Sequence, residues 1–319
     1  MLRLLNQALS PGGARGRLAI LIFHRVLREP DPLLPSEPDA AWFEALMSDM
    51  RRWFNVIPLE EGARRLAARD LPPRALAVTF DDGYADNHDV ALPILDRLGL
   101  HATFFIATGF LGGGIMWNDR VIEAIRLAQG TTIDLQALNC GVIPIGSAAE
   151  RRVAIDRVLA ALKYRAPSDR LSAVDMLCAI ARAAPRADLM MTRAQVKRLV
   201  SAGMGIGAHT RHHPILTTLD ARAARDEIAA GKADLEKIAE RPVRLFAYPN
   251  GRPGTDYGAA HVELVRELGF TAACSTAPGI AASGDDVHQL PRMSTWDRVR
   301  WRNGLRLSKH LWRSQHARA

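Results

Sequence analysis

Short apolar stretches alternate with amphipathic segments along most of this chain, and this alternation restricts the fold more than any other feature of the sequence. The apolar stretches predict strands over residues 18–23, 55–58, 75–80, 102–107, 204–208, 245–248 and 270–274. The amphipathic segments predict helices over residues 40–54, 59–68, 86–98, 118–128, 192–202, 221–239 and 259–268. Strands that alternate with helices pair in parallel through right-handed crossovers. The sequence therefore predicts an α/β protein.

Two segments break the alternation. Residues 129–189 contain a Gly- and Pro-bearing patch followed by Ala-, Arg- and Leu-rich helical stretches, and we interpret them as a helical insertion. Residues 296–319 form a basic tail with seven Lys or Arg side chains and one acidic residue, Asp297. We therefore expect a main domain over residues 18–295, with the insertion inside it and the tail after it.

Charge and composition exclude several classes of protein. The net charge is +8, and the tail carries most of it, leaving about +2 for the rest, which argues against nucleic acid as a partner. The apolar run at residues 18–23 is too short to span a bilayer, and no small-residue cleavage site follows it. The scattered cysteines, Cys140, Cys178 and Cys274, fit no disulfide framework. We expect a cytoplasmic protein without a clear signal peptide.

Polar residues follow several of the predicted strands directly. His24 follows the first, Asp81 and Asp82 follow residues 75–80, and His209 follows residues 204–208. A further polar group, Pro249-Asn250-Gly251, follows residues 245–248. Because α/β folds keep their chemistry at the carboxyl ends of the strands, we expect one shared site.

The residue types in this group indicate a metal site. Asp82, His209 and His213 offer one oxygen and two nitrogens, which suits zinc, with cobalt and nickel as alternatives. The HxxxH spacing puts both imidazoles on one side of a helical turn or in a tight loop, and Gly83 permits a sharp turn. Asp81 can then accept a proton from the attacking water. Each motif alone is more often structural, and it is their joint position after strands that favours chemistry.

These residues resemble a known family. Thr79-Phe80-Asp81-Asp82-Gly83 together with the run from His209 to His213 is similar to the two metal-site motifs of the polysaccharide deacetylases, the NodB-homology enzymes of carbohydrate esterase family 4. The resemblance covers roughly residues 18–292. It implies a distorted (β/α) barrel of about seven parallel strands, and metal-dependent removal of N- or O-acetyl groups, with N-acetyl favoured, from an acetylated glycan.

The resemblance also assigns roles. It implies Asp81 as the catalytic base, with Asp82, His209 and His213 as metal ligands. The run 246–251 is similar to a motif in which the residue after proline, here Asn250 where many relatives have Tyr, offers its N–H to the oxyanion. Pro-Asn-Gly is equally typical of a plain β-turn.

The roles of the general acid and of a supporting arginine are assigned by resemblance to one branch of the family. Residues 22–26 resemble the first strand of the poly-N-acetylglucosamine deacetylases, in which the motif order looks circularly permuted, and this favours His24 over the late candidate His288 as the acid. Arg292, in a segment similar to that branch's closing strand, is expected to pair with Asp81 and keep it ionised, a surface arginine being the alternative.

Other interpretations stay open on the sequence alone. A catalytically inactive carbohydrate-binding barrel and a barrel amidohydrolase for small cyclic amides share the same strand-end pattern. The tail, with Trp296, Trp301 and Trp312 among its basic residues, fits either a peripheral contact with an anionic membrane or an amphipathic helix that covers the barrel.

Overall fold

The computed structural model describes residues 1–184, 186, 188–294, 297, 299–313 and 318–319. Its contacts divide the chain into two compact units. The first comprises residues 1–29, 36–111 and 191–319, and the second comprises residues 30–35 and 112–190. The insertion predicted for residues 129–189 falls inside the second unit.

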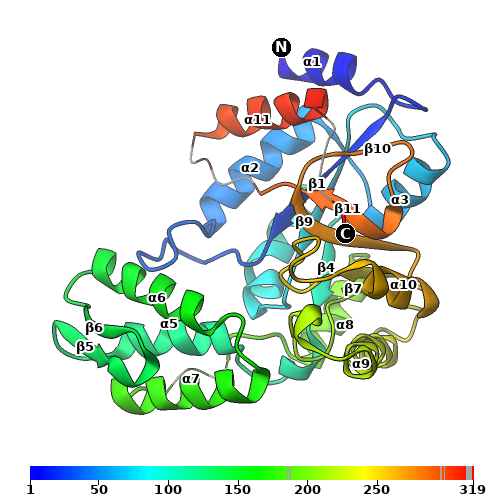
Figure 1. Cartoon of the computed structure of the whole chain (residues 1–319). Helices are drawn as coiled ribbons and strands as arrows, with labels where there is room; N and C mark the ends of the chain where they lie inside the picture. The colour runs from blue at the N-terminus through cyan, green and yellow to red at the C-terminus, as the bar shows by residue number, and fades with distance from the viewer. Residues whose placement is uncertain (185, 187, 295–296, 298, 314–317) are drawn as a thin grey trace. The chain divides into compact units, whose positions relative to one another are not determined.

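The first unit is built on a nine-stranded sheet (Figure 1). Its strands are β1 (Arg17–Phe23), β2 (Asn55–Val56), β3 (Ala75–Phe80), β4 (Thr103–Ile106), β7 (Gly205–Ala208), β8 (Leu245–Ala247), β9 (Ala272–Pro278), β10 (Ala281–Ala282) and β11 (Leu290–Arg292). Seven of them pair in parallel in the order β1-β3-β4-β7-β8-β9-β11. A bridge between Leu21 and Met293 brings the last strand back to the first. The predicted barrel of seven parallel strands is confirmed, and it is nearly closed.

The strands are buried on both faces. One face of the curled sheet lines a core inside it, and the other face lies against a core covered by the helices. In β3 all six residues are buried, and Leu76, Val78 and Phe80 face the core beneath the helices. Ala75 and Ala77 face a second core on the other side. This two-sided burial explains why β3 is a continuous apolar run instead of an alternating one.

The helices of the first unit follow the predicted pattern closely, apart from α1, which the sequence did not predict. They are α1 (Leu2–Leu9), α2 (Ala40–Trp53), α3 (Leu59–Ala67), α4 (Leu92–Arg97), α8 (Arg193–Ser201), α9 (Ala221–Ala239), α10 (Ala259–Glu267) and α11 (Arg300–Arg313). The helix predicted over residues 86–98 is divided, since a π-helical turn, Asn87–Ala91, precedes α4. Pro93 lies in the first turn of α4, where its missing N–H costs no hydrogen bond.

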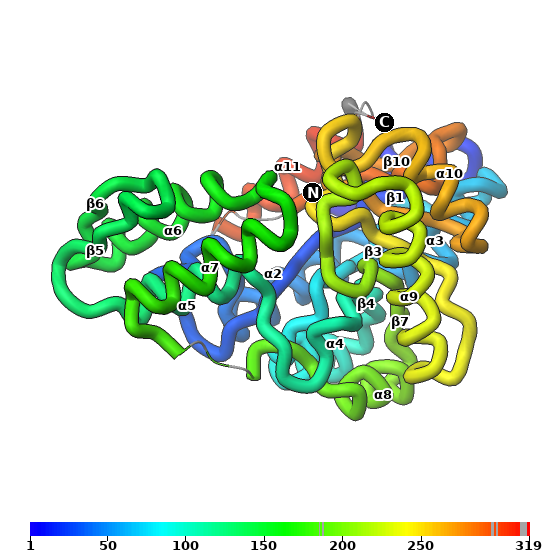
Figure 2. The backbone as a smooth tube through the Cα atoms, turned by 60° about the horizontal axis from the view of Figure 1, so that its bottom comes forward, coloured from blue at the N-terminus to red at the C-terminus, as the bar shows by residue number. Residues whose placement is uncertain are grey.

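The second unit, whose helices and hairpin are green in Figure 2, has its own hydrophobic core. It contains α5 (Trp117–Leu127), α6 (Ala148–Leu162) and α7 (Pro167–Ala181), and α5 packs against both of the others. It also contains an antiparallel hairpin of β5 (Thr132–Leu135) and β6 (Gly141–Pro144), which the sequence did not predict. Leu135 and Ile143 of the hairpin are buried in the same core as the helices.

The basic tail contains the helix α11, which packs against α1 and α2. Leu307 and Leu311 are buried in the core of the first unit, so one face of α11 covers the barrel. Trp296 and Arg298 lie outside the described residues. Within the described part of the chain, no helix is both long enough and apolar enough to cross a membrane.

Candidate active site

The predicted strand-end residues lie at one end of the barrel. Asp81 follows β3, and its N–H donates to the carbonyl of Phe23 at 2.9 Å, which ties it to the end of β1. The next residue, Asp82, accepts at its carbonyl from Ala107 N–H, just after β4. His209 follows β7 and donates its N–H to Ile106 at 3.3 Å. Parallel pairing therefore brings residues from distant parts of the sequence to one edge.

Asp82, His209 and His213 form a compact group of metal-type ligands. One atom from each lies within 4.8 Å of the others. Asp82 Oδ1 is 3.4 Å from His209 Nε2 and 3.3 Å from His213 Nε2. That buried oxygen accepts no hydrogen bond from the described residues, which leaves it available to a cation. His209 Nδ1 lies 2.7 Å from the carbonyl of Ala247, a contact that directs Nε2 toward Asp82. One oxygen and two imidazole nitrogens fit zinc with an open coordination position.

The backbone at the site adopts a conformation that residues other than glycine rarely take. Asp82, Thr210, His213 and Asn250 all have φ between +54° and +74°. Gly83 has φ +92°, and a Cβ added there would lie 3.0 Å from Ile106 Cγ2. The HxxxH segment is thus a tight loop, one of the two geometries expected for it. Left-handed residues gathered in one place are typical of functional sites, where the surrounding structure holds the strain.

Asp81 pairs with Arg292 in the interior of the barrel. The two guanidinium nitrogens Nη1 and Nη2 each lie 2.7 Å from one carboxylate oxygen, and both side chains are almost wholly buried. Arg292 also donates Nε–H to the carbonyl of Ser275 and Nη1–H to Thr79 Oγ1. The sequence left two possibilities for Arg292, a pair with Asp81 or a position on the surface. The structure shows the buried pair with Asp81.

The surroundings of the two carboxyls determine their charge. Burial raises the pKa of Asp81, but Arg292 and then His209 outweigh burial, so the pKa lies below its ordinary value. Burial also raises the pKa of Asp82, and His213 and His209 more than offset it. Both groups are therefore ionised at neutral pH. Burial lowers the pKa of His213 to about 4, which keeps its imidazole neutral, the form that binds metal.

Asn250 lies after β8, and His24 directly follows β1. Thr276 Oγ1 donates to the Asn250 carbonyl at 2.6 Å, and among the described residues nothing accepts the Asn250 N–H. His24 lines a cavity together with Arg292 and Thr276. Its charge also lowers the pKa of both Asp81 and Asp82, which places it near them. His288 is occupied elsewhere, with Nε2 3.0 Å from the carbonyl of Phe270.

Two residues of α9 that sequence reasoning missed hold the histidine loop. Glu227 accepts the N–H groups of Arg211 and His212 and also contacts the His212 ring at 2.7 Å. Gly231 lies so close to the loop that an added Cβ would be 2.5 Å from the carbonyl of Thr210. A glutamate inside a helix carries no sequence signal for such a contact, because it is ordinary on a solvated helix face. A glycine inside a helical pattern is unfavourable, and this is the one signal that could have indicated a close approach at Gly231.

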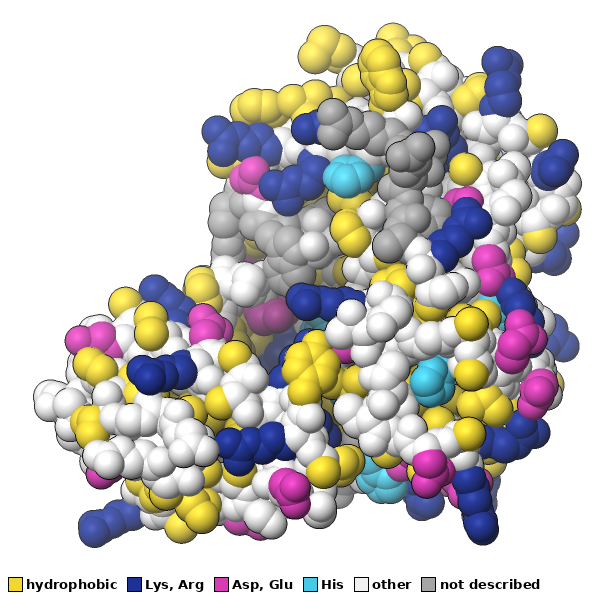
Figure 3. Space-filling view, viewed as in Figure 1, with side chains coloured by type: hydrophobic (Ala, Val, Ile, Leu, Met, Phe, Trp, Pro, Cys, Tyr) yellow, Lys and Arg dark blue, Asp and Glu magenta, His cyan; other side chains and the backbone are white. Residues whose placement is uncertain are grey.

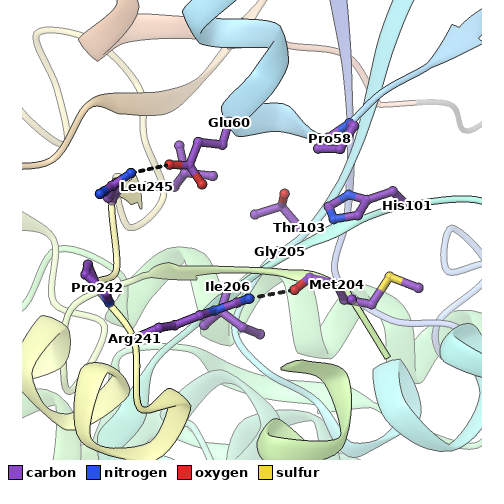
Figure 4. A pocket seen from close by; sticks show the side chains of 12 residues that line it. Pro58, Glu60, His101, Thr103, Met204, Gly205, Ile206, Arg241, Pro242 and Leu245 are labelled. Carbon is purple, nitrogen blue, oxygen red and sulfur yellow. Dashed lines mark hydrogen bonds and ion pairs between the residues drawn. The ribbon is translucent and has the colours of Figure 1, made fainter. Parts of the chain in front are cut away.

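A second pocket lies at the opposite end of the strands (Figure 4). It is lined by Thr103, Gly205 and Leu245, the first residues of β4, β7 and β8, and by His101 and Glu60. Its one carboxylate, Glu60, lies 3.5 Å from Arg244. Among the described residues, the side chains that line this pocket do not form a group of three metal-type ligands like that around Asp82. The site at the carboxyl ends is therefore the better candidate.

Comparison with known sequences decides the family. The sequence model of the polysaccharide deacetylases matches residues 68–132 and 170–273, which together make up more than half of the chain. The chain belongs to the polysaccharide deacetylase family. It is thus a polysaccharide deacetylase, a hydrolase of carbon–nitrogen bonds other than peptide bonds. A curated relative, YxkH of Bacillus subtilis (strain 168), is 19% identical over 279 residues, which cover 87% of this chain and 71% of YxkH.

Solved structures share the fold of this deacetylase. IcaB from Ammonifex degensii is 19% identical with a TM-score of 0.62, over 95% of this chain and 98% of IcaB. The Streptococcus pyogenes deacetylase PplD, solved in complex with acetate, is 20% identical with a TM-score of 0.61, over 91% of this chain and 97% of PplD. The BpsB deacetylase domain from Bordetella bronchiseptica is 17% identical with a TM-score of 0.53, over 88% of this chain and 96% of that domain.

Proposed function

We propose that this deacetylase is metal-dependent and removes N-acetyl groups from a glycan polymer or oligomer. The observation that carries the proposal is the separation of two adjacent carboxylates into different surroundings. Asp82 faces two imidazoles, whereas Asp81 is held by Arg292 with Oδ2 3.9 Å from His209 Nε2. One carboxylate is thereby suited to hold a cation, and its neighbour to accept a proton beside it.

Asp82, His209 and His213 are the residues that would hold the ion. The chemistry that a zinc-like ion supplies there is Lewis acidity, which makes a water easier to deprotonate and polarises the acetyl carbonyl. The supporting features in the chain are the donor set, the unpaired Asp82 Oδ1 and the fixed orientation of His209.

The chain's own residues then carry the proton transfers. Asp81 accepts a proton as the water oxygen bonds to the acetyl carbon. The Asn250 N–H donates a hydrogen bond to the oxygen that becomes negatively charged. His24 in its protonated form gives a proton to the sugar nitrogen as the carbon–nitrogen bond breaks, so that acetate and a free amine are the products.

The test is acetate release from N-acetylated oligosaccharides, with defined divalent metals added back to metal-free protein. We expect Asp81→Asn to lower kcat by about 10²–10⁴-fold, the range typical of a lost general base. Asp96→Asn, the same change on an exposed residue of α4, is the matched control and keeps wild-type activity. Near-native activity of Asp81→Asn would remove the base assignment. Failure of every added metal to support acetate release, or turnover of small cyclic amides alone, would overturn the proposed function.

A further inference from the structure

Two helices that are far apart in the sequence, α1 and α11, pack together on the first unit (Figure 1). Ser308 Oγ donates to Asn6 Oδ1 at 2.7 Å in a buried contact between them. Gly304 lets the helices approach closely, since an added Cβ would lie 2.8 Å from both Leu2 Cδ1 and Trp53 Cζ3. The pair is therefore one continuous surface element.

The outer face of this element exposes large apolar side chains. On α11 the exposed fractions are 55% for Trp301, 42% for Leu305 and 76% for Trp312, and on α1 they are 75% for Leu4 and 41% for Leu5. A soluble monomer rarely leaves so many large apolar side chains together in water unless they meet a partner. We name these five residues the apolar strip.

The positions on α11 form a narrow stripe that borders α1. At about 100° per residue, Trp301, Leu305 and Trp312 lie within roughly 40° of one another around the helix. Gly304 and Ser308, the α11 residues that contact α1, lie beside that stripe on one side. The exposed strips of the two helices are thus contiguous, and Figure 3 shows apolar side chains gathered over this part of the molecule.

Basic side chains border the other side of the stripe. Lys309, Arg302 and Arg306 are all exposed and follow the stripe around α11 in that order. Neither the α1 segment nor residues 300–313 contains an acidic residue, so nothing within these helices neutralises the charge. The element therefore combines apolar contact area with a positive border.

We propose that the apolar strip and its basic border dock this protein on the surface of an anionic lipid bilayer. An interfacial helix buries apolar side chains at the level of the headgroups while its lysines and arginines meet lipid phosphates. A second copy of the chain fits less well, because a symmetric contact would bring the same basic border face to face.

The helix that forms this docking surface, α11, also borders the candidate active site. Arg306 and His310 of α11 line the cavity that contains His24 and Arg292. The helix that contacts the bilayer is therefore a wall of the site, and a glycan held at the membrane surface has a short path to it. The docking surface stands on its own contacts and does not depend on the proposed reaction.

The experiment is co-sedimentation of the full chain with vesicles of phosphatidylcholine alone or mixed with phosphatidylglycerol, at low and high salt. Trp301→Gln/Trp312→Gln removes apolar area, and Arg302→Ser/Lys309→Ser removes charge. Matched controls carry the same kinds of change on exposed residues elsewhere, Tyr164→Gln/Leu171→Gln and Arg222→Ser/Lys237→Ser. Thermal unfolding of each variant verifies that it folds.

We expect binding to the anionic vesicles only, weakened by salt, and a fall in the partition coefficient of about tenfold or more for each α11 double variant. The matched controls bind like the wild type. No binding of the wild type, or equal binding of the folded α11 variants, would overturn the proposal. It would also fail if the wild type sediments as a dimer that the tryptophan changes convert to a monomer, because a second copy would then be the partner.

Discussion

Asp81 and Asp82 are neighbours in the chain, yet their contacts give them different chemistry. Arg292 meets both oxygens of Asp81, while Asp82 Oδ1 lies 3.4 Å from His209 Nε2 and 3.3 Å from His213 Nε2. The left-handed backbone at Asp82, with φ +74°, is what turns the second carboxylate away from the first. Two like charges so close in sequence are tolerated because each has a separate positive or metal-binding partner.

Replacement of Arg292 tests how strongly its guanidinium lowers the pKa of Asp81. In Arg292→Met the burial of Asp81 remains, and burial raises its pKa, while the charge that lowers the pKa is gone. The acid limb of the pH profile of kcat/KM is therefore expected to move to higher pH. The unfolding free energy is expected to fall by about 3–5 kcal/mol, since the change leaves a buried carboxylate unpaired.

Two further variants separate the charge of Arg292 from its packing. Arg292→Lys keeps the charge without the two-point contact, so its acid limb should move less than that of Arg292→Met. Arg222→Met, on an exposed arginine of α9, should change neither stability nor the limb. A destabilised Arg292→Met enzyme with an unmoved acid limb would show that Arg292 has a structural role only.

At the scale of helices and strands, most of the barrel and part of the candidate site could be predicted from the sequence. The limits of β3 and of α9 agree with prediction at both ends, because a turn or a cap bounds each pattern; Asp220, for example, accepts from the N–H of Ala223. The residues at the ends of the strands were predictable because parallel pairing fixes where those ends meet.

The elements that were missed lack such local signals. The hairpin β5–β6 lies before the Ala-, Arg- and Leu-rich helical stretches of the insertion, and each of its strands has only four residues, too few for a clear pattern. Burial in the core of the second unit holds these strands. Likewise, Glu227 and Gly231 matter only because α9 packs against the histidine loop. Contacts of this kind depend on tertiary structure, which no local pattern of residues reports.

The close approach of α9 to the histidine loop gives a prediction with a distinctive sign. In an ordinary helix interior, Gly→Ala stabilises by up to about 1 kcal/mol. Gly231→Ala should instead destabilise the protein and weaken zinc binding, because the new Cβ would collide with the backbone of Thr210. Thermal unfolding and a zinc titration measure the two effects.

Gly258→Ala is the matched control for this change. It adds the same methyl group at a position where a Cβ meets nothing within 4 Å. Gly258 is the N-cap of α10, where alanine is less favourable than glycine, so we expect a loss of stability of about 1 kcal/mol or less and no change in zinc binding. A Gly231→Ala protein that is more stable than the wild type and binds zinc normally would mean that the loop moves aside freely.

Across the whole molecule, the candidate metal site joins strand ends of the barrel that lie far apart in the sequence. Asp82 follows β3, and both histidines follow β7, with β4 paired between those strands. The barrel is itself closed by only a short contact between Leu21 and Met293. A cation held by ligands from separate strands should therefore stabilise the folded barrel as well as serve the reaction, since the ion binds the folded state and not the unfolded chain.

Metal removal tests this link between site and fold. At a free zinc concentration of about 100 times Kd, the gain in unfolding free energy should be about 2.7 kcal/mol, seen as a Tm several degrees above that of the chelator-treated protein. His213→Ala loses a ligand and should lose the zinc-dependent gain, whereas His212→Ala should keep it, since the His212 ring contacts Glu227 instead of the ligand group. An equal zinc response in both variants would show that the ion binds elsewhere, because the two histidines are adjacent in the same loop and only one of them belongs to the candidate metal site.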